Sequence, residues 1–206
     1  MRRENLGAML TGLGAVCLGV FFGMCHVQSV QNHKNDRPIA ESYIVERVEA
    51  IECVEEPLEA PLDPDIPEDV QIAARNYGEI YGICPEFLTA IAFYESSYRP
   101  HAENGSCKGL MQINIDAQYE RMEEMGVTVE DLYDPYTSMA VASDYLLELF
   151  ERYEDPAVVL MIYNGDRRVW ELTERGEMSV YARNVLTLSA ELEEKHGKVG
   201  DAYGCK

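Results

Sequence analysis

The chain has 206 residues, of which 47% are hydrophobic, so it has room for one globular domain and some additional segments. Its formal net charge of -20 argues against nucleic acid as a partner, because phosphate binding requires clustered lysine and arginine. Composition changes along the chain and predicts four parts. These are an N-terminal membrane anchor or signal segment (1–27), an acidic linker that contains proline (28–66), a helical domain (67–196) and a tail (197–206).

The first part contains an uncharged, apolar run over residues 6–25, which is long enough to cross a bilayer as a helix. Arg2 and Arg3 precede this run, so we expect a single-pass anchor in the cell membrane with everything after Cys25 outside the cytoplasm. The alternative is a cleaved signal peptide that leaves a secreted chain, with the cleavage point near Val27-Gln28-Ser29. The length of the run favours the anchor.

The second part is strongly acidic. The stretch from Glu41 to Asp69 contains eleven acidic residues and one basic residue, Arg47. Prolines stand at positions 57, 61, 64 and 67. Because like charges repel and proline interrupts helices, we expect an extended, solvated tether here. A short amphipathic helix before Pro57 is the alternative for its first half.

The six cysteines predict neither a disulfide nor a metal site. Cys17 and Cys25 lie in the apolar run, where cysteine behaves as a small apolar residue. The other four are expected outside the membrane, where disulfides can persist: Cys53, Cys84, Cys107 and Cys205. Their spacing matches no zinc pattern, and four cysteines allow three pairings. We therefore predict no metal and no cofactor.

From Pro67 onward apolar residues recur at helical spacing, which predicts a mainly α-helical domain. Five helices are expected, and they begin at Pro67, Pro85, Pro135, Pro156 and about Ser179. The first should stop at Gly82, the fourth near Asn164-Gly165 and the fifth near His196. Alternation typical of strands never extends over more than a few residues, so residues 99–116 are expected to be irregular.

Glu95 stands on the second predicted helix, where a buried apolar residue is expected. An apolar stripe surrounds it, formed by Phe87, Leu88, Ile91, Ala92 and Tyr94. Burial and the negative end of the helix dipole should both raise its pKa, since Pro100 forces the helix to end nearby. A carboxyl that stays protonated near neutral pH can act as a general acid. The alternative is a structural glutamate that pairs with Arg99 or caps a loop.

Four sequence elements follow one another in the helical part: LTAIAFYESS (88–97), GLMQI (109–113), Asp134-Pro135 with Tyr145-Leu146, and Tyr163-Asn164. In this order they resemble the ES, GLMQ, DP…YL and AYN motifs of the soluble lytic transglycosylases, goose-lysozyme-like enzymes that cut peptidoglycan. Tyr181 is similar to the tyrosine that opens the last helix of that family. The resemblance covers residues 67–194 and implies a lysozyme-like helical catalytic domain.

The resemblance implies a peptidoglycan lytic transglycosylase in which Glu95 is both acid and base. This glutamate would protonate the oxygen of the β-1,4 bond between MurNAc and GlcNAc. As a carboxylate it would then accept the proton of the MurNAc C6 hydroxyl, which closes on C1 and leaves a 1,6-anhydro end. The resemblance also implies substrate-binding positions at Ser96, Gln112, Tyr163, Asn164 and Tyr181.

Specific roles follow for three of these residues. Ser96 would orient the site or the peptide-linked sugar, and Gln112 would offer its amide to N-acetyl or hydroxyl groups of the substrate. Tyr163 would donate its hydroxyl to Glu95 or to the sugar. The alternative for each is a packing or helix-end role. The chain departs from the family pattern at Asn104, Ser138, Ala142 and Ile162, which leaves the details of substrate preference open.

Two other functions remain open. A hydrolase on the same fold needs a second carboxylate to activate water, and Asp116 is the nearest candidate in the sequence. A non-catalytic glycan-binding scaffold would not need Glu95. By analogy with anchored enzymes that open the cell wall, a secretion or conjugation complex is an expected partner besides the glycan strands. An acidic enzyme gains no general attraction to an anionic wall, so glycan contacts or a partner must bring it to its substrate.

Overall fold

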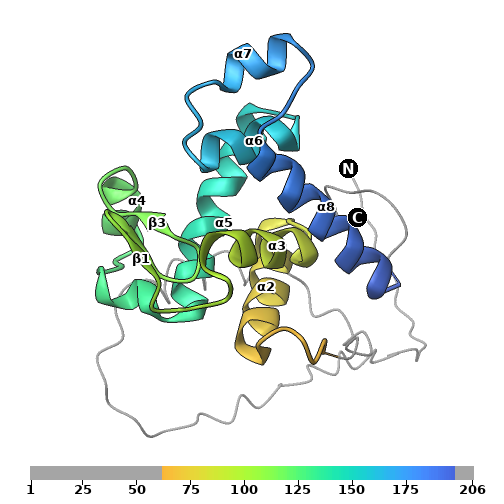
Figure 1. The fold of residues 1–206 in the computed structure, drawn as a ribbon. Helices are drawn as coiled ribbons and strands as arrows, with labels where there is room; N and C mark the ends of the chain where they lie inside the picture. Colours follow the sequence, from red (N-terminus) through yellow and green to blue (C-terminus); the bar gives the residue numbers. More distant parts are fainter. Residues whose placement is uncertain (1–61, 198–206) are drawn as a thin grey trace, which may run out of the picture. The chain divides into compact units, whose positions relative to one another are not determined.

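The computed structural model describes residues 62–197, which form a mainly helical domain (Figure 1). The predicted membrane segment and nearly all of the predicted linker lie outside these residues, as do Cys53 and Cys205. Within the described range, none of the helices combines the length and the apolar character needed to cross a membrane.

All five predicted helices are present. They are α2 (Glu68–Tyr81), α3 (Pro85–Ser96), α5 (Pro135–Arg152), α6 (Pro156–Tyr163) and α8 (Val180–Lys195). Asp134, Asp155 and Ser179 each accept a hydrogen bond from a backbone N–H of the first turn that follows, as N-cap residues do. Gly82 ends α2 in the left-handed conformation, with φ of 67°. Local capping therefore set these boundaries.

The structure also contains short elements that we did not predict. They are α4 (Tyr119–Glu124), the 3-10 helix η1 (Glu130–Tyr133), α7 (Val169–Glu174), β1 (Glu103–Asn104), β2 (Cys107–Lys108) and β3 (Ile113–Asn114). The strands form an antiparallel sheet in the order β1-β2-β3, within the segment expected to be irregular. Glu103 pairs with Lys108, and Lys108 pairs with Ile113. Two residues per strand are too few to show alternation in the sequence.

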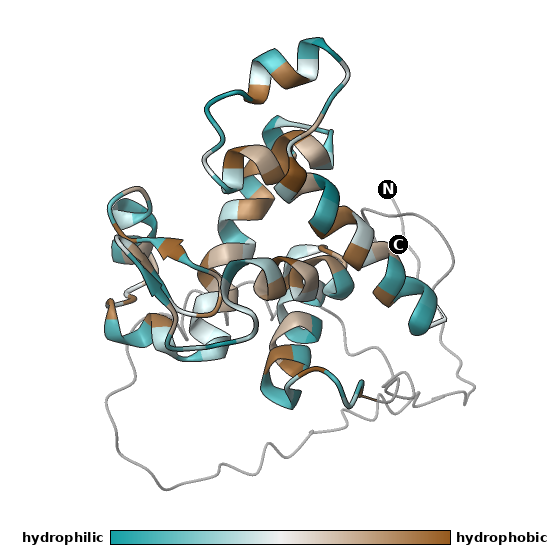
Figure 2. Ribbon diagram, in the orientation of Figure 1, coloured by the Kyte–Doolittle hydropathy of each residue, from teal (hydrophilic) through white to brown (hydrophobic). Residues whose placement is uncertain are grey.

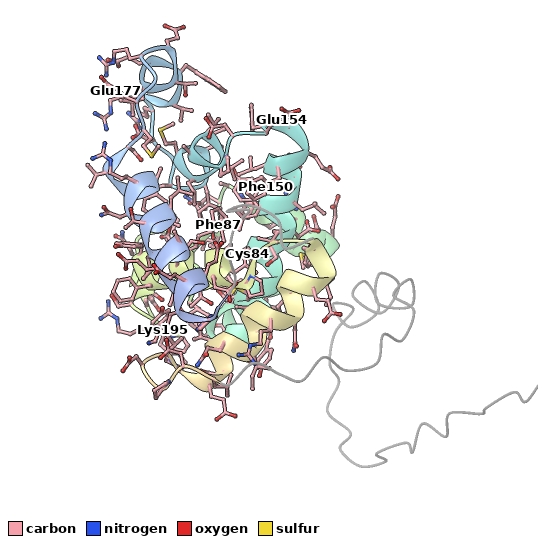
Figure 3. All side chains as sticks on the ribbon, turned by 90° about the vertical axis from the view of Figure 1, so that its right-hand side faces the viewer. Cys84, Phe87, Phe150, Glu154, Glu177 and Lys195 are labelled. Atoms are coloured by element: carbon pink, nitrogen blue, oxygen red, sulfur yellow. The ribbon has the colours of Figure 1, made fainter. Side chains whose placement is uncertain are left out.

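Helix α3 lies at the centre of the domain, packed against α2 and α8, while α5 packs on α2 (Figure 1). Its first two turns or so are buried on nearly every side, since Phe87, Leu88, Ala90, Ile91 and Ala92 are each at most 1% exposed. The apolar character of α3 and of α6 is visible in Figure 2. Figure 3 shows Phe87 beside Phe150 of α5, with 5.8 Å between the ring centroids.

This burial corrects the predicted stripe on α3. A single apolar face was expected, with Tyr94 on it, but Tyr94 is 39% exposed and its neighbour Phe93 is 40% exposed. The helix is buried around its whole circumference up to Ala92 and then emerges from the core. Glu95 therefore lies where α3 leaves the core, on the wall of a cleft.

Residues 62–66, which we predicted as the end of the linker, contact the helical domain. The backbone N–H of Asp63 donates to Gln71 Oε1, and Gln71 Nε2 donates to the Asp63 carbonyl, each at 2.8 Å. Lys195, near the end of α8 (Figure 3), places its Nζ 2.6 Å from the buried Asp63 carboxylate. This ion pair joins the first described residues to the last helix.

Candidate active site

Glu95 occupies the last turn of α3 and faces a cleft of about 450 Å³. The helix ends at Ser96, and Ser97 and Tyr98 follow with positive φ values of 51° and 61°. The sheet, α5, α6 and α8 supply most of the other walls, with side chains that include Asn104, Gln112, Tyr145, Tyr163, Asn164 and Tyr181. Among the described residues that line this cleft, Glu95 is the only carboxylate.

The environment of Glu95 favours its protonated form. Burial raises the pKa of the carboxyl from 4.5 to about 7, and a hydrogen bond from Tyr181 opposes part of that rise. The phenol donates to Oε1 at 2.5 Å. Glu95 makes no ion pair with Arg99 among the described residues, so the alternative of a structural Glu95–Arg99 pair is not what the structure contains.

Tyr181 stands in the first turn of α8, two residues after the capping Ser179. Burial raises its pKa well above the ordinary value of 10, and the neighbouring Glu95 carboxylate raises it further. The phenol therefore keeps its proton and remains a hydrogen-bond donor to Glu95. The structure thus places Tyr181 in direct contact with the candidate acid.

Tyr163, the last residue of α6, uses its hydroxyl differently from the prediction. It donates to the backbone carbonyl of Met111 at 2.9 Å, and its ring lies 5.8 Å from that of Tyr145. A tyrosine hydroxyl has one proton to donate, so it is not directed at Glu95. Tyr163 lines the cleft and also fastens the GLMQ segment to α6.

The GLMQ segment is held tightly from several directions. Leu110 and Met111 are fully buried, and the Met111 N–H donates to Ser138 Oγ of α5 at 3.0 Å. Gly109 has φ of 79°, and a Cβ added there would lie 2.0 Å from the Leu132 carbonyl oxygen. Glycine is therefore required at this position. Ser138, one of the departures from the family pattern, supplies a buried acceptor that holds this segment.

Gln112 is presented to the cleft by a strained backbone, with φ of 48°. Its Nε2 donates to the carbonyls of Ala102 and Gly109, each at 3.0 Å. Because only the nitrogen of the amide can satisfy two carbonyls, its orientation is determined by these partners. The side-chain oxygen is therefore the atom that remains to accept a hydrogen bond from a ligand.

The other two predicted residues differ in position. Asn164 follows α6, is exposed and lines the cleft. Ser96 is only 2% exposed and does not belong to the cleft wall. Its hydroxyl donates to the Ala92 carbonyl at 3.1 Å and accepts from the Arg99 N–H at 3.2 Å. Ser96 thus fixes the turn after α3, the helix-end role that was its alternative.

Several cleft residues were not predicted as site residues. Three of them stood out in the sequence: Tyr94 on the apolar stripe, Asn104 as a departure from the family pattern and Tyr145 in the DP…YL motif. Cys107 and Gln118 also line the cleft, but no sequence pattern indicated a site role for them. Burial raises the pKa of the Cys107 thiol, and Cys107 forms no disulfide within the described residues. Residues 62–197 contain no cluster of His, Cys, Asp or Glu suited to a metal ion.

Asp116, the candidate second carboxylate, does not share the cleft with Glu95. It lines a separate cavity of about 410 Å³ together with apolar residues such as Met122 and Val127. It also accepts a hydrogen bond of 2.5 Å from Ser106. In this position it faces a different cavity from the one into which Glu95 projects.

The fold and this cleft define a class of protein. A family model described as Transglycosylase SLT domain matches residues 72–177, and the chain belongs to this family. Members of the family are typically lytic transglycosylases, which act on peptidoglycan.

A solved structure supports the same fold. The chain is similar to the X-ray structure of an inactive mutant of the lytic transglycosylase Slt from Pseudomonas aeruginosa, with a TM-score of 0.54 and 17% identity. The match covers 65% of this chain and 25% of that one, so the chain spans about a quarter of that protein. No curated protein matches the chain.

Proposed function

We propose that the protein is a peptidoglycan lytic transglycosylase that cleaves the β-1,4 bond between MurNAc and GlcNAc and leaves 1,6-anhydro-MurNAc ends. The observation that carries the proposal is Glu95, which has a pKa of about 7 and is the single carboxylate among the described residues that line the cleft of about 450 Å³. At neutral pH a large fraction of this group is protonated and ready to donate. General acid catalysis of this kind contributes about 10²- to 10⁴-fold in rate.

One carboxyl suffices for a balanced reaction. Glu95 gives its proton to the glycosidic oxygen as the bond from that oxygen to C1 breaks, and the GlcNAc hydroxyl leaves. The Glu95 carboxylate then takes the proton of the MurNAc C6 hydroxyl, and O6 bonds to C1. No water is consumed, and Glu95 ends protonated. Because the attacking hydroxyl belongs to the substrate, positioning replaces a second catalytic residue.

The cleft supplies supporting contacts for this reaction. Tyr181 donates to the carboxylate form of Glu95 and so stabilises it between the two proton transfers. The Gln112 side-chain oxygen and the exposed Asn164 amide offer hydrogen-bonding groups to the sugars. Tyr163 and Ser138 hold the segment that presents Gln112.

The competing hydrolase needs a second carboxylate that activates water near the scissile bond. The position of Asp116 in a separate cavity disfavours that alternative. A non-catalytic scaffold would have no use for a carboxyl with a raised pKa in a cleft. We therefore keep the hydrolase and the scaffold as outcomes of the test.

The test is mass spectrometry of muropeptides from purified peptidoglycan digested with the full chain in detergent, and with the Glu95→Gln and Asp116→Asn variants. We expect products one water lighter than hydrolysis products from the parent and from Asp116→Asn, and none from Glu95→Gln. Hydrated reducing ends that depend on Asp116 would show a hydrolase. Absence of cleavage by the parent would contradict the enzymatic proposal.

We also propose that residues 6–25 anchor the enzyme in the cell membrane, with the catalytic domain outside the cytoplasm beside a secretion or conjugation complex. The support is the uncharged run after Arg2 and Arg3 and the acidic linker that follows it. The expected result is recovery of the intact chain in the membrane fraction. Release of a chain whose mass lacks the first part would show a cleaved signal instead.

A further inference from the structure

A second cleft, of about 460 Å³, is also lined by Glu95. It shares Glu95, Asn104 and Gln112 with the first cleft. Its remaining wall consists of Arg99, His101, Ala102 and Glu103. The two clefts therefore adjoin each other at Glu95.

Arg99 brings a positive charge into this second cleft, in a protein with a formal net charge of -20. Its Nε donates to the Ser96 carbonyl at 2.9 Å, which fixes the start of the guanidinium group. In the described part of the chain Arg99 makes no ion pair, and the residue is exposed. The terminal guanidinium N–H groups are therefore left to bind an anion, in the planar arrangement that suits a carboxylate.

The other charged groups of this cleft do not neutralise Arg99. Glu103 is held by Lys108, whose Nζ lies 2.8 Å from Oε2, and by the hydroxyl of Tyr133. His101 stacks on the Tyr133 ring, with 5.3 Å between the centroids. Glu95 is uncharged in the form that donates its proton. In this cleft the Glu103 carboxylate already has its partners, whereas the Arg99 guanidinium has no ion-pair partner among the described residues.

We propose that this second cleft binds the carboxylates of the peptide stem carried by MurNAc, with Arg99 as the residue that pairs with them. The inference rests on the proposed function, because it takes peptidoglycan as the substrate. In intact peptidoglycan the lactyl carboxyl of MurNAc is bound in the amide to the peptide, so the anionic groups near the cleaved bond belong to the peptide. Arg99 then supplies the local attraction that the acidic protein lacks as a whole. Ser96 is the positioning residue for this guanidinium.

The experiment measures binding of the full chain, in detergent and in the inactive Glu95→Gln background, to two soluble glycan preparations. One carries peptide stems. The other has been stripped of them by an amidase, and the lactyl carboxylates that the amidase leaves on MurNAc have been converted to methyl amides, so that it carries no carboxylate. Arg99→Met keeps the length of the side chain and removes its charge, whereas Arg99→Lys keeps the charge. Arg183→Met is the matched control, because Arg183 is exposed, makes no ion pair in the described range and lines neither cleft.

We expect strands with peptides to bind about 10-fold more tightly than stripped strands, the effect of one charge-assisted pair. Arg99→Met should abolish that preference without weakening binding of stripped strands. Arg99→Lys should retain part of the preference for strands with peptides, and Arg183→Met should retain all of that preference. Conversion of the peptide carboxylates to amides should lower the affinity of the parent background to that for stripped strands.

Equal affinity for both preparations, a preference that survives in Arg99→Met, or equal losses on both preparations would each overturn the assignment. Failure of the proposed function would look different. The parent chain would then produce no anhydro ends from either preparation, whatever the binding preference. Circular dichroism of each variant separates loss of the fold from loss of the contact.

Discussion

The hydroxyl of Tyr181 donates a 2.5 Å hydrogen bond to Glu95 Oε1, across 86 residues of sequence. This bond connects the first turn of the last helix to the final turn of the central helix. It is made to the same carboxyl whose pKa burial raises to about 7. The two effects oppose each other, so the ionisation of Glu95 depends on packing between α3 and α8.

We expect the kcat/KM of the parent to fall as the pH rises through about 7, because Glu95 of the substrate-free enzyme must be protonated to donate. Tyr181→Phe removes a bond that favours the carboxylate, so the alkaline limb should move up by about one pH unit. The same loss should lower kcat at the optimum by about tenfold, since the intermediate carboxylate is less stabilised. The measurement is the pH profile of anhydro-product formation. If the alkaline limb of Tyr181→Phe stayed at the pH of the parent, Tyr181 would not tune the ionisation of Glu95.

Tyr163→Phe provides the comparison. Its hydroxyl serves the Met111 carbonyl, so the substitution leaves a buried acceptor unpaired and should lower the free energy of unfolding by about 1–3 kcal/mol. The alkaline limb should stay near that of the parent, because the hydroxyl does not contact Glu95. Urea unfolding and the pH profile together check this. A shift as large as that of Tyr181→Phe would mean that Tyr163 tunes the acid directly.

Glu95→Gln should stabilise the fold at alkaline pH. A carboxyl with a folded pKa of about 7 and an ordinary value of 4.5 binds its proton more tightly in the folded state, so the parent loses stability as the pH rises between these values. Above both pKa values the parent has lost about 3 kcal/mol of its free energy of unfolding. Urea unfolding followed by circular dichroism should show the variant more stable at pH 8 and much less so at pH 5.

The control for that measurement is Glu191→Gln, an exposed glutamate of α8. It should change the free energy of unfolding by less than about 0.5 kcal/mol at either pH. An equal gain from both substitutions would attribute the effect to net charge instead of to the buried carboxyl.

Gly109→Ala should be far more damaging than Gly105→Ala. Both glycines have positive φ values, 79° and 59°, so alanine costs about 1–2 kcal/mol of backbone strain at either position. A Cβ at Gly105 would meet nothing within 4 Å, whereas at Gly109 it would lie 2.0 Å from the Leu132 carbonyl oxygen. We expect Gly109→Ala to lower the free energy of unfolding by at least about 3 kcal/mol. Similar losses in thermal unfolding would show that the GLMQ segment can move away from η1.

The sequence predicted the five long helices because their starts and stops depend on neighbouring residues. Asp134, Asp155 and Ser179 cap the helices that follow them, and Gly82 ends α2. The short strands and α7 escaped prediction. Two-residue strands exist through their pairing with one another, and α7 is too short to show periodicity.

For the site, the sequence by itself indicated that Glu95 is an acid next to apolar residues, and the family resemblance implied that GLMQ and Tyr163 belong near it. Only the tertiary structure decided which partner each group takes: Tyr181 donates to Glu95, Tyr163 to Met111, and Ser96 fixes the turn that carries Arg99. Helix periodicity and capping are set by residues within one or two turns. A hydrogen bond between α3 and α8 depends on how whole helices pack, which no local pattern encodes.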